Sequence, residues 1–481
     1  MSRLRRSVII QLFSSNGATA AHFVVSLILA RILSPNDIGI FSITVVVANV
    51  AHIFRDFGVN SYLRAVKDCT PETIRAANGI LLVSSSSMGI FLFSISGLVA
   101  GYYAQPGIEN VMRVLAVGFF FIPFGATTLA LLARELNAEA NAWINLWSVL
   151  SYSITAVALA YLDFGYMSMA WANLITIIAT GLAAARFRPS YAPWLPSLRG
   201  WRKVVNFGTG SILGNSIGAI NSALPDVMLG KMSGPYDVGL LSRANSTASL
   251  FTQIASPTVN YAALPHLAPI HHRGESLEPT LCKASAYLSC LGWPALLVTA
   301  IFSRDVILLL YGPTWLECEP AIQLLCLMGA INLLVSFDVA ALSAIGRPYL
   351  ASLPEISLFF LRAGCVLLCY DQSLASFAWG LVIAEALNYP IHRQLQSRKL
   401  GVRGRSLLIA LRPSILSALV CGLVTWLMAR LLPVDLAPVL RLLAVTVLIV
   451  PVWVFSLKLF AHPFSQEIDT LLLVARRRFG W

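Results

Sequence analysis

The sequence has little charge and no long polar segment. Asp, Glu, Lys and Arg make up 12% of the 481 residues, against a usual share of roughly 25% in soluble domains. Hydrophobic residues make up 57%, which excludes a disordered chain, a coiled coil and an ordinary cytosolic enzyme. The apolar residues form runs of about 20, which is enough for a helix to cross a bilayer. We therefore expect an all-α polytopic membrane protein.

Motifs that bind metals or nucleotides are also missing. None of the eight cysteines forms a Cys-x-x-Cys motif, and most lie inside apolar runs, where they act as small hydrophobic side chains. The loop cluster His271-His272-Arg273 lacks the spacing of a metal site, and no Gly-x-x-x-x-Gly-Lys-Ser/Thr loop occurs. We expect no catalytic residues, no metal and no cofactor, and therefore a protein that is not an enzyme.

The apolar runs predict about fourteen membrane-spanning helices. In the first half of the chain they cover residues 7–33, 38–59, 79–100, 111–132, 143–162 and 167–185. In the second half they cover residues 204–229, 238–263, 284–302, 321–345, 356–370, 374–388, 407–429 and 442–460. The eleventh and twelfth are the shortest, so their ends are the least well defined.

The basic residues predict the orientation. The net charge of +12 comes from 34 Lys and Arg against 22 Asp and Glu. In a soluble protein this excess would favour nucleic-acid binding, but in a membrane protein Lys and Arg gather in cytoplasmic loops. With the N-terminus placed in the cytoplasm, most of them fall on the cytoplasmic side. We expect both termini in the cytoplasm and no nucleic-acid partner.

A short segment occurs twice in the chain. Residues 35–42 (PNDIGIFS) recur as residues 235–242 (PYDVGLLS), without a gap. Each copy follows an equivalent predicted helix, and an even number of spans separates them, so both copies lie on the same membrane face. This predicts two parallel lobes related by an axis along the membrane normal, an architecture of transporters.

The expected domains follow from the repeat. They are an N-terminal six-helix lobe (1–186), a cytoplasmic linker (187–203), a C-terminal six-helix lobe (204–394), two additional transmembrane helices (395–460) and a basic cytoplasmic tail (461–481). The linker is rich in proline and basic residues, and the tail predicts a short helix on the membrane surface.

Polar side chains inside predicted spans are the candidates for function, because a charge at mid-helix costs about 2.5–3.5 kcal/mol. As substrate-binding candidates we take Arg31, Arg55, Arg243, Arg362, Asn215, Asn221 and Asn245. As ion-coupling candidates we take Asp56, Asp226, Asp338 and Glu385. Two alternatives stay open: Arg55 and Asp56 can snorkel, and Asp338 and Glu385 can be partners of arginines within the bundle. Arginine inside a membrane suits an anionic substrate such as a phosphate or diphosphate.

Four motifs resemble those of a known family. Residues 29–41 (LARILSPNDIGIF) resemble the opening signature of the bacterial polysaccharide transporter family, the Wzx-type flippases of the multidrug/oligosaccharidyl-lipid/polysaccharide exporter superfamily. Residues 54–59 (FRDFGV), followed by Leu63-Arg64, resemble its second-helix segment. Residues 311–315 (YGPTW) and 344–348 (AIGRP) resemble the turns after its ninth and tenth helices.

The resemblance implies a two-lobed, alternating-access transporter of the bacterial inner (cytoplasmic) membrane. It would move an undecaprenyl-diphosphate-linked oligosaccharide to the outer leaflet for O-antigen, capsule or exopolysaccharide assembly. The product's consumption, or an ion gradient, would set the direction. Implied partners are the lipid-linked oligosaccharide, membrane lipids, a polysaccharide polymerase and export machinery.

Other functions stay open from the sequence. Two belong to the same superfamily, a cation-coupled small-molecule exporter and a lipid II flippase. A third is a membrane polysaccharide polymerase or ligase, which would usually carry a sizeable outer loop with acid/base residues. The family motifs transfer no substrate-binding residue.

Overall fold

A computed structural model describes residues 3–433 and 435–470. Over these residues the secondary structure is helical and no strand occurs, which confirms the all-α expectation. The chain divides into two compact units, Met1–Ser242 and Arg243–Trp481. The predicted lobe and linker boundaries remain predictions.

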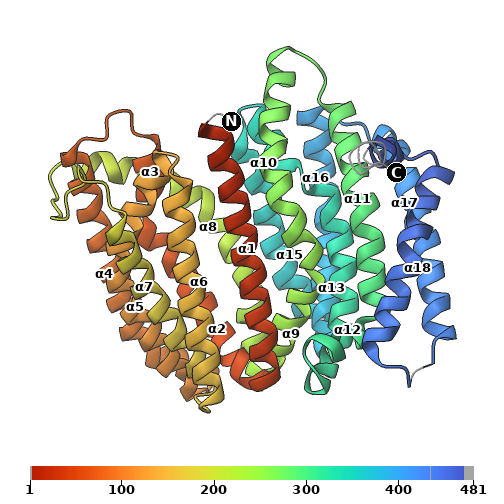
Figure 1. The fold of residues 1–481 in the computed structure, drawn as a ribbon, viewed down its shortest axis with the longest axis horizontal. Coiled ribbons are helices and arrows are strands. Elements are labelled where there is room, and N and C mark those ends of the chain that lie inside the picture. The colour runs from red at the N-terminus through yellow and green to blue at the C-terminus, as the bar shows by residue number, and fades with distance from the viewer. Residues whose placement is uncertain (1–2, 434, 471–481) are drawn as a thin grey trace, which may run out of the picture. The chain divides into compact units, whose positions relative to one another are not determined.

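The first unit is a bundle of long helices. Its elements are α1 (Arg3–Ile32), α2 (Pro35–Asp56), α3 (Val59–Ala65), α4 (Pro71–Tyr103), α5 (Pro106–Arg134), α6 (Ala138–Tyr161), α7 (Met167–Arg186), α8 (Trp201–Met232) and the start of α9 (Pro235–Ala248). α5 packs between α4 and α7, α6 packs on α7 and α1, and α2 packs on α4 and α8. Figure 1 shows α4, α5 and α7 side by side.

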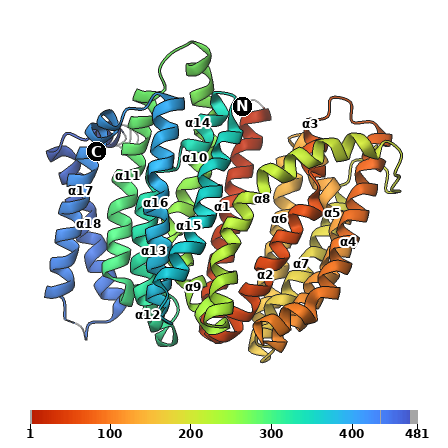
Figure 2. The same ribbon diagram turned by 180° about the vertical axis from the view of Figure 1, so that it is seen from behind.

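The second unit begins within α9. Its further elements are α10 (Leu250–His272), α11 (Glu278–Ile301), α12 (Ser303–Leu310), η1 (Pro313–Cys318), α13 (Glu319–Asn332), η2 (Leu333–Val335), α14 (Asp338–Ala344), η3 (Pro348–Ala351), α15 (Ser352–Cys369), α16 (Leu374–Leu400), α17 (Gly404–Leu431) and α18 (Pro438–Leu459). α16 packs on α13 and α15, and α11 packs on α13 and α17. α17 and α18 stand together at one edge of this unit (Figure 2).

Eleven described helices are long and apolar enough to cross a membrane. They coincide with the second to sixth and the ninth to fourteenth predicted spans, which makes this a multi-pass membrane protein. The other three predicted spans coincide with α1, α8 and the pair α9 and α10, which are not among these eleven. The count of fourteen is therefore not confirmed.

Three predicted spans differ from the helices observed. The eighth is divided between α9 and α10, and the tenth is broken into α13, η2 and α14. The twelfth, predicted to end at residue 388, continues as α16 to Leu400, where Gly401 (φ 72°) ends it and the Val402 amide donates to the Gln396 carbonyl (3.0 Å). The extension contains polar side chains that are satisfied inside the unit, so a hydropathy pattern cannot detect it.

The two copies of the repeat pack against each other within the first unit. A Cβ added to Gly39 would lie 1.7 Å from the carbonyl oxygen of Pro235, and one added to Gly239 would lie 1.9 Å from that of Pro35. The first turns of α2 and α9 therefore cross with their backbones in contact, and only glycine permits this approach. The contact is reciprocal, since each glycine meets the backbone of the other copy. We call it the repeat crossing.

Local sequence explains why these helices begin where they do. Ser34 caps α2, with its hydroxyl accepting from the Asp37 amide while Asp37 accepts from the Ser34 amide, and Pro35 takes the first helical position. Thr70 and Ser373 cap α4 and α16 in the same way through their hydroxyls.

Candidate functional site

The family-like motifs lie largely at turns. In residues 54–59, Phe57 and Gly58 adopt positive φ angles of 43° and 66° and connect α2 to α3. Gly312 (φ 96°) and Gly346 (φ 73°) occupy the turns of the other two motifs. A left-handed backbone favours glycine, so these motifs shape the chain. Trp315 is fully buried, which fits the same structural role.

Arg55 and Asp56 end α2 in the first unit. The Arg55 guanidinium is largely buried, and its Nε and Nη1 have no hydrogen-bond partner among the described residues. Its charge interacts with the neighbouring Asp56, whose carboxylate accepts a hydrogen bond from Asn60 of α3. The Ser84 hydroxyl of α4 donates to the Arg55 carbonyl (2.6 Å). A buried cation with open donors is suited to bind an anion.

The other candidates of the first unit lie apart from Arg55 along the chain. Arg31 is exposed at the end of α1. Asn221 of α8 is buried, and Asp226 of α8 is half-buried beside Tyr103 of α4, whose hydroxyl donates to the Val227 carbonyl (3.4 Å). The side chain of the remaining candidate, Asn215, lies outside the described residues.

Arg243 and Asn245 lie on α9 at the start of the second unit. Arg243 is half-buried, with Tyr311 and Cys318 as electrostatic neighbours. The hydroxyls of Thr247 and Tyr311 are 2.9 Å apart, so the 311–315 motif packs on α9. Asn245 is exposed. These contacts fix residues 311–315 against α9, and Arg243 contributes a positive charge beside them.

Arg362 and Glu385 come together between α15 and α16. The Arg362 Nη2 lies 3.4 Å from the Glu385 Oε2, and the two side chains are 14% and 6% exposed. The alternative in which Glu385 is the partner of an arginine within the bundle is therefore the arrangement observed. A buried ion pair of this kind avoids the cost of an isolated charge.

Asp338 has different partners from those expected. Its Oδ2 lies 2.8 Å from the His392 Nδ1, and its Oδ1 accepts from the Gln396 Nε2 at 2.7 Å. Gln396 in turn accepts from Arg393. The carboxylate is thus held by a histidine and an amide, and α14 is joined to α16 through these bonds.

Sequence reasoning missed three residues of this region: Asn388, His392 and Gln396. The latter two lay beyond the predicted end of the twelfth span, and Asn388 was its last residue. The signal that was available is their spacing after Glu385, because steps of three or four residues follow one helix face. A second buried pair was also missed, Arg441 of α18 with Asp305 of α12 (2.9 Å), because both residues fell in predicted outer loops.

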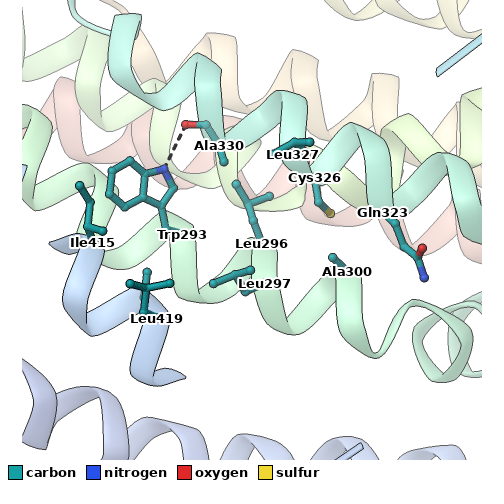
Figure 3. A pocket seen from close by; sticks show the side chains of 11 residues that line it. Trp293, Leu296, Leu297, Ala300, Gln323, Cys326, Leu327, Ala330, Ile415 and Leu419 are labelled. Carbon is teal, nitrogen blue, oxygen red and sulfur yellow. Dashed lines mark hydrogen bonds between the residues drawn. The ribbon is translucent and has the colours of Figure 1, made fainter. Parts of the chain in front are cut away.

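An apolar pocket of about 330 Å³ lies between α11, α13 and α17. In Figure 3, Trp293 and Gln323 lie at its two ends, and leucine side chains line it between them. The Trp293 Nε1 donates to the Ala330 carbonyl (3.0 Å). Leu327 and Leu419 are exposed, so the pocket opens at the surface of the second unit.

A second apolar pocket of about 470 Å³ lies in the first unit. Its lining comes from α2, α4 and α8, and it includes Phe54, Met88, Phe91 and Val227. Phe54 directly precedes Arg55. The described residues contain no group of three or more His, Cys, Asp or Glu side chains that could hold a metal ion.

Comparison with known proteins adds relatives at low identity. The chain is 25% identical over 326 residues to an uncharacterized membrane protein in the cps region of Klebsiella pneumoniae, covering 65% of each chain. It is 22% identical over 307 residues to the lipopolysaccharide biosynthesis protein WzxC of Escherichia coli (strain K12), covering 63% of this chain and 62% of that protein. It is 26% identical over 349 residues to the succinoglycan biosynthesis transport protein ExoT of Rhizobium meliloti (strain 1021), covering 71% and 69%. The match spans less than two thirds of the first two proteins.

Solved structures share the fold. A lipid II flippase MurJ in an inward closed conformation matches with a TM-score of 0.75 and 12% identity, over 96% of this chain and 100% of that one. An inward-facing multidrug resistance MATE family transporter of the MOP superfamily matches with a TM-score of 0.66 and 14% identity, over 80% and 94%. These likenesses concern the fold.

The sequence pattern of a family described as polysaccharide biosynthesis protein matches residues 28–320. This range covers more than half of the chain and includes three of the four motifs that carried the resemblance. The chain belongs to this polysaccharide biosynthesis family.

Proposed function

We propose that this protein is a flippase for an undecaprenyl-diphosphate-linked oligosaccharide. It moves the repeat unit across the bacterial inner membrane for surface or exopolysaccharide assembly. The observation that carries the proposal is the combination of a polysaccharide biosynthesis family with a fold shared by a lipid flippase and a multidrug transporter. The name of the Rhizobium relative, a succinoglycan biosynthesis transport protein, supports transport.

The diphosphate needs a cation within the membrane region. Arg55 is a good candidate, because its buried guanidinium has donors without hydrogen-bond partners among the described residues. Guanidinium binds phosphate oxygens with two parallel hydrogen bonds. Arg362 is less available, because Glu385 already lies against it. The diphosphate of the substrate would bind Arg55.

The polyprenyl tail needs an apolar surface. The pocket beside Phe54 adjoins Arg55 in sequence and has an apolar lining. The tail already lies in bilayer hydrocarbon, which is as apolar as leucine, so the pocket offers it van der Waals contacts and not a transfer from water. The head at Arg55 and the tail in this pocket would bind the two ends of one lipid.

Transport of this kind needs no covalent chemistry, so we propose that the protein is not an enzyme. In the cell both termini lie in the cytoplasm, as the basic loops predict. A polysaccharide polymerase and export machinery would consume the product and draw the reaction forward.

A deletion strain tests the proposed function. We expect lipid-linked oligosaccharide to accumulate on the cytoplasmic side of the inner membrane and surface polysaccharide to disappear, both restored by the full chain. Periplasmic accumulation of unpolymerised repeat units would contradict the proposal and favour a polymerase or ligase. Arrested growth with accumulation of lipid II would favour the lipid II flippase.

A further inference from the structure

One face of α16 changes from apolar to polar along its length. It begins with Leu374, Ala378 and Leu381, all buried. It continues with Glu385, Asn388, His392 and Gln396, at steps of three or four residues that keep them on one side of the helix. We call these four residues the α16 polar stripe. The helix α16 packs on α14 and α15 in the second unit (Figure 2).

Asp338 fixes the hydrogen-bonding state of the stripe. Gln396 accepts from Arg393 with its Oε1, so its amino group is directed at Asp338 and donates to the Oδ1 (2.7 Å). The other oxygen of Asp338 lies 2.8 Å from the His392 Nδ1. An ionised carboxylate accepts from both partners. The His392 Nδ1 therefore carries hydrogen.

This arrangement leaves one atom of His392 free to change its protonation. With hydrogen on Nδ1, the Nε2 is the atom that gains or loses a proton. The side chain is 18% exposed, so part of the ring reaches the surface of the unit. Uptake of one proton there forms an imidazolium beside the Asp338 carboxylate, which compensates its charge. No other bond forms or breaks.

Asn388 lies one turn from both His392 and Glu385. It is 1% exposed, and neither its Nδ2 nor its Oδ1 has a hydrogen-bond partner among the described residues. Buried polar groups are nearly always satisfied by protein or ordered water. The amide therefore marks a place for water between the two ionisable side chains of the stripe.

Charged side chains of α15 lie beside the stripe. Arg362 of α15 pairs with Glu385 (3.4 Å), and Glu355 of α15 is a further electrostatic neighbour of Glu385. On α16 itself, Tyr389 has Arg393 and Asp338 as its neighbours.

α13, which also packs on α16, carries two titratable side chains with other partners. Glu319 accepts from Ser303 (3.5 Å), and Cys326 lines the pocket of Figure 3.

We propose that the α16 polar stripe is a proton-binding site, in which the His392 Nε2 takes up the proton and a water on Asn388 connects it to Glu385. The proposal rests on the proposed transport function, because a proton bound here would couple substrate movement to the proton gradient.

The protonation itself can be measured without substrate. The purified full chain with isotope-labelled histidine has seven histidine signals, and the His392→Gln variant identifies the signal of His392. On acidification from pH 8 to pH 5 we expect Nε2 to gain a proton while Nδ1 keeps its own. The Asn388→Leu variant should shift the midpoint, and the exposed-loop control His271→Gln should not. A His392 that keeps one charge state, or loses the proton at Nδ1, would overturn the proposal.

The coupling is tested in vesicles of phosphatidylethanolamine and phosphatidylglycerol that enclose a pH-sensitive dye. Lipid-linked oligosaccharide extracted from the host serves as the probe. We expect the wild-type chain and His271→Gln to move protons with it, and His392→Gln to lose proton movement. Proton movement by His392→Gln at the wild-type rate overturns the proposal. Flipping by the wild type without proton movement also overturns it but leaves the flippase intact. If the wild type does not flip the probe, the proposed function fails, and the histidine signals still decide the proton site.

Discussion

At the scale of residues, buried charges in this protein are matched by partners from a different helix. Arg362 pairs with Glu385, and Arg441 with Asp305. Arg55 differs, because its guanidinium keeps open donors among the described residues. A buried charge without full compensation lowers stability. We therefore expect Arg55 to be retained for binding, at a cost in stability.

Replacing Arg55 by Gln should therefore affect function much more than stability. We expect the unfolding temperature of the purified protein to change little, because removal of buried donors without partners offsets the lost attraction to Asp56. Surface polysaccharide should fall strongly at unchanged protein level, with partial activity in Arg55→Lys, since Lys offers only a point charge. The control Arg113→Gln removes an exposed arginine paired with Glu109. A fully active Arg55→Gln variant would show that Arg55 does not bind substrate.

His462 predicts a pH dependence at the end of α18. Its Nδ1 accepts from the Phe464 amide (3.0 Å). Its Nε2 lies 2.9 Å from the Ser414 hydroxyl, which donates to the Ala286 carbonyl (3.0 Å). His462 is therefore neutral with hydrogen on Nε2. Burial lowers its pKa below 6.5.

Stability from this contact should be present above pH 6.5 and lost as the pH falls, because the unfolded form then binds a proton that the folded form resists. We expect amide exchange in residues 463–470, measured relative to the intrinsic exchange rate at the same pH, to be less protected at pH 5 than at pH 7.5. In His462→Gln, whose amide can make both bonds but does not titrate, this change should be smaller. An equal pH response in both proteins would contradict the assignment.

At the scale of elements, the repeat crossing joins the first turns of α2 and α9. An alanine at Gly39 or Gly239 places its Cβ within 2 Å of a backbone oxygen, which forces the helices apart. Gly101 of α4 is a matched control, because a Cβ there meets no atom within 4 Å.

Gly39→Ala and Gly239→Ala should each lower the unfolding temperature. Their effects should not add, since they disturb one contact. Gly101→Ala should be neutral or gain about 0.5–1 kcal/mol from helix propensity. Thermal unfolding of the purified variants measures this, and a Gly39→Ala variant as stable as the wild type would exclude the crossing.

The pair of Asp305 and Arg441 connects α12 to α18 in the second unit, with the two side chains 6% and 9% exposed. Arg441→Leu alone should destabilise by roughly 3–5 kcal/mol, because it leaves a buried carboxylate without its partner. The double variant Asp305→Leu/Arg441→Leu should recover most of this loss, since two apolar side chains can replace a buried pair. Denaturation of all three proteins gives the coupling. A double variant as unstable as the single one would contradict this account.

The sequence predicted most elements because hydrophobic runs report helix length directly. One of the two alternatives that it left open for Glu385, an arginine partner within the bundle, is the arrangement observed with Arg362. It missed the break between α13 and α14 and the extension of α16, since hydropathy depends on composition and not on backbone geometry. It also missed His392 and Asn388. The residues that surround such buried polar side chains, such as Asp338 beside His392, are distant in sequence.

At the scale of the whole molecule, the chain is an all-α membrane protein that has a transporter fold and belongs to a polysaccharide biosynthesis family. The proposed transport requires no covalent step. Its task would be to carry a charged head past hydrocarbon while the apolar tail stays in an apolar setting. Arg55 and the pocket beside Phe54 supply these two surfaces in the first unit.

The central claim is tested most directly by reconstitution. The purified full chain is placed in vesicles that contain lipid-linked oligosaccharide from the host, and an impermeant glycosidase is added outside. The account predicts that the oligosaccharide of the inner leaflet becomes accessible with the wild-type chain, and much more slowly with Arg55→Gln. Accessibility that stays at the level of protein-free vesicles would contradict it.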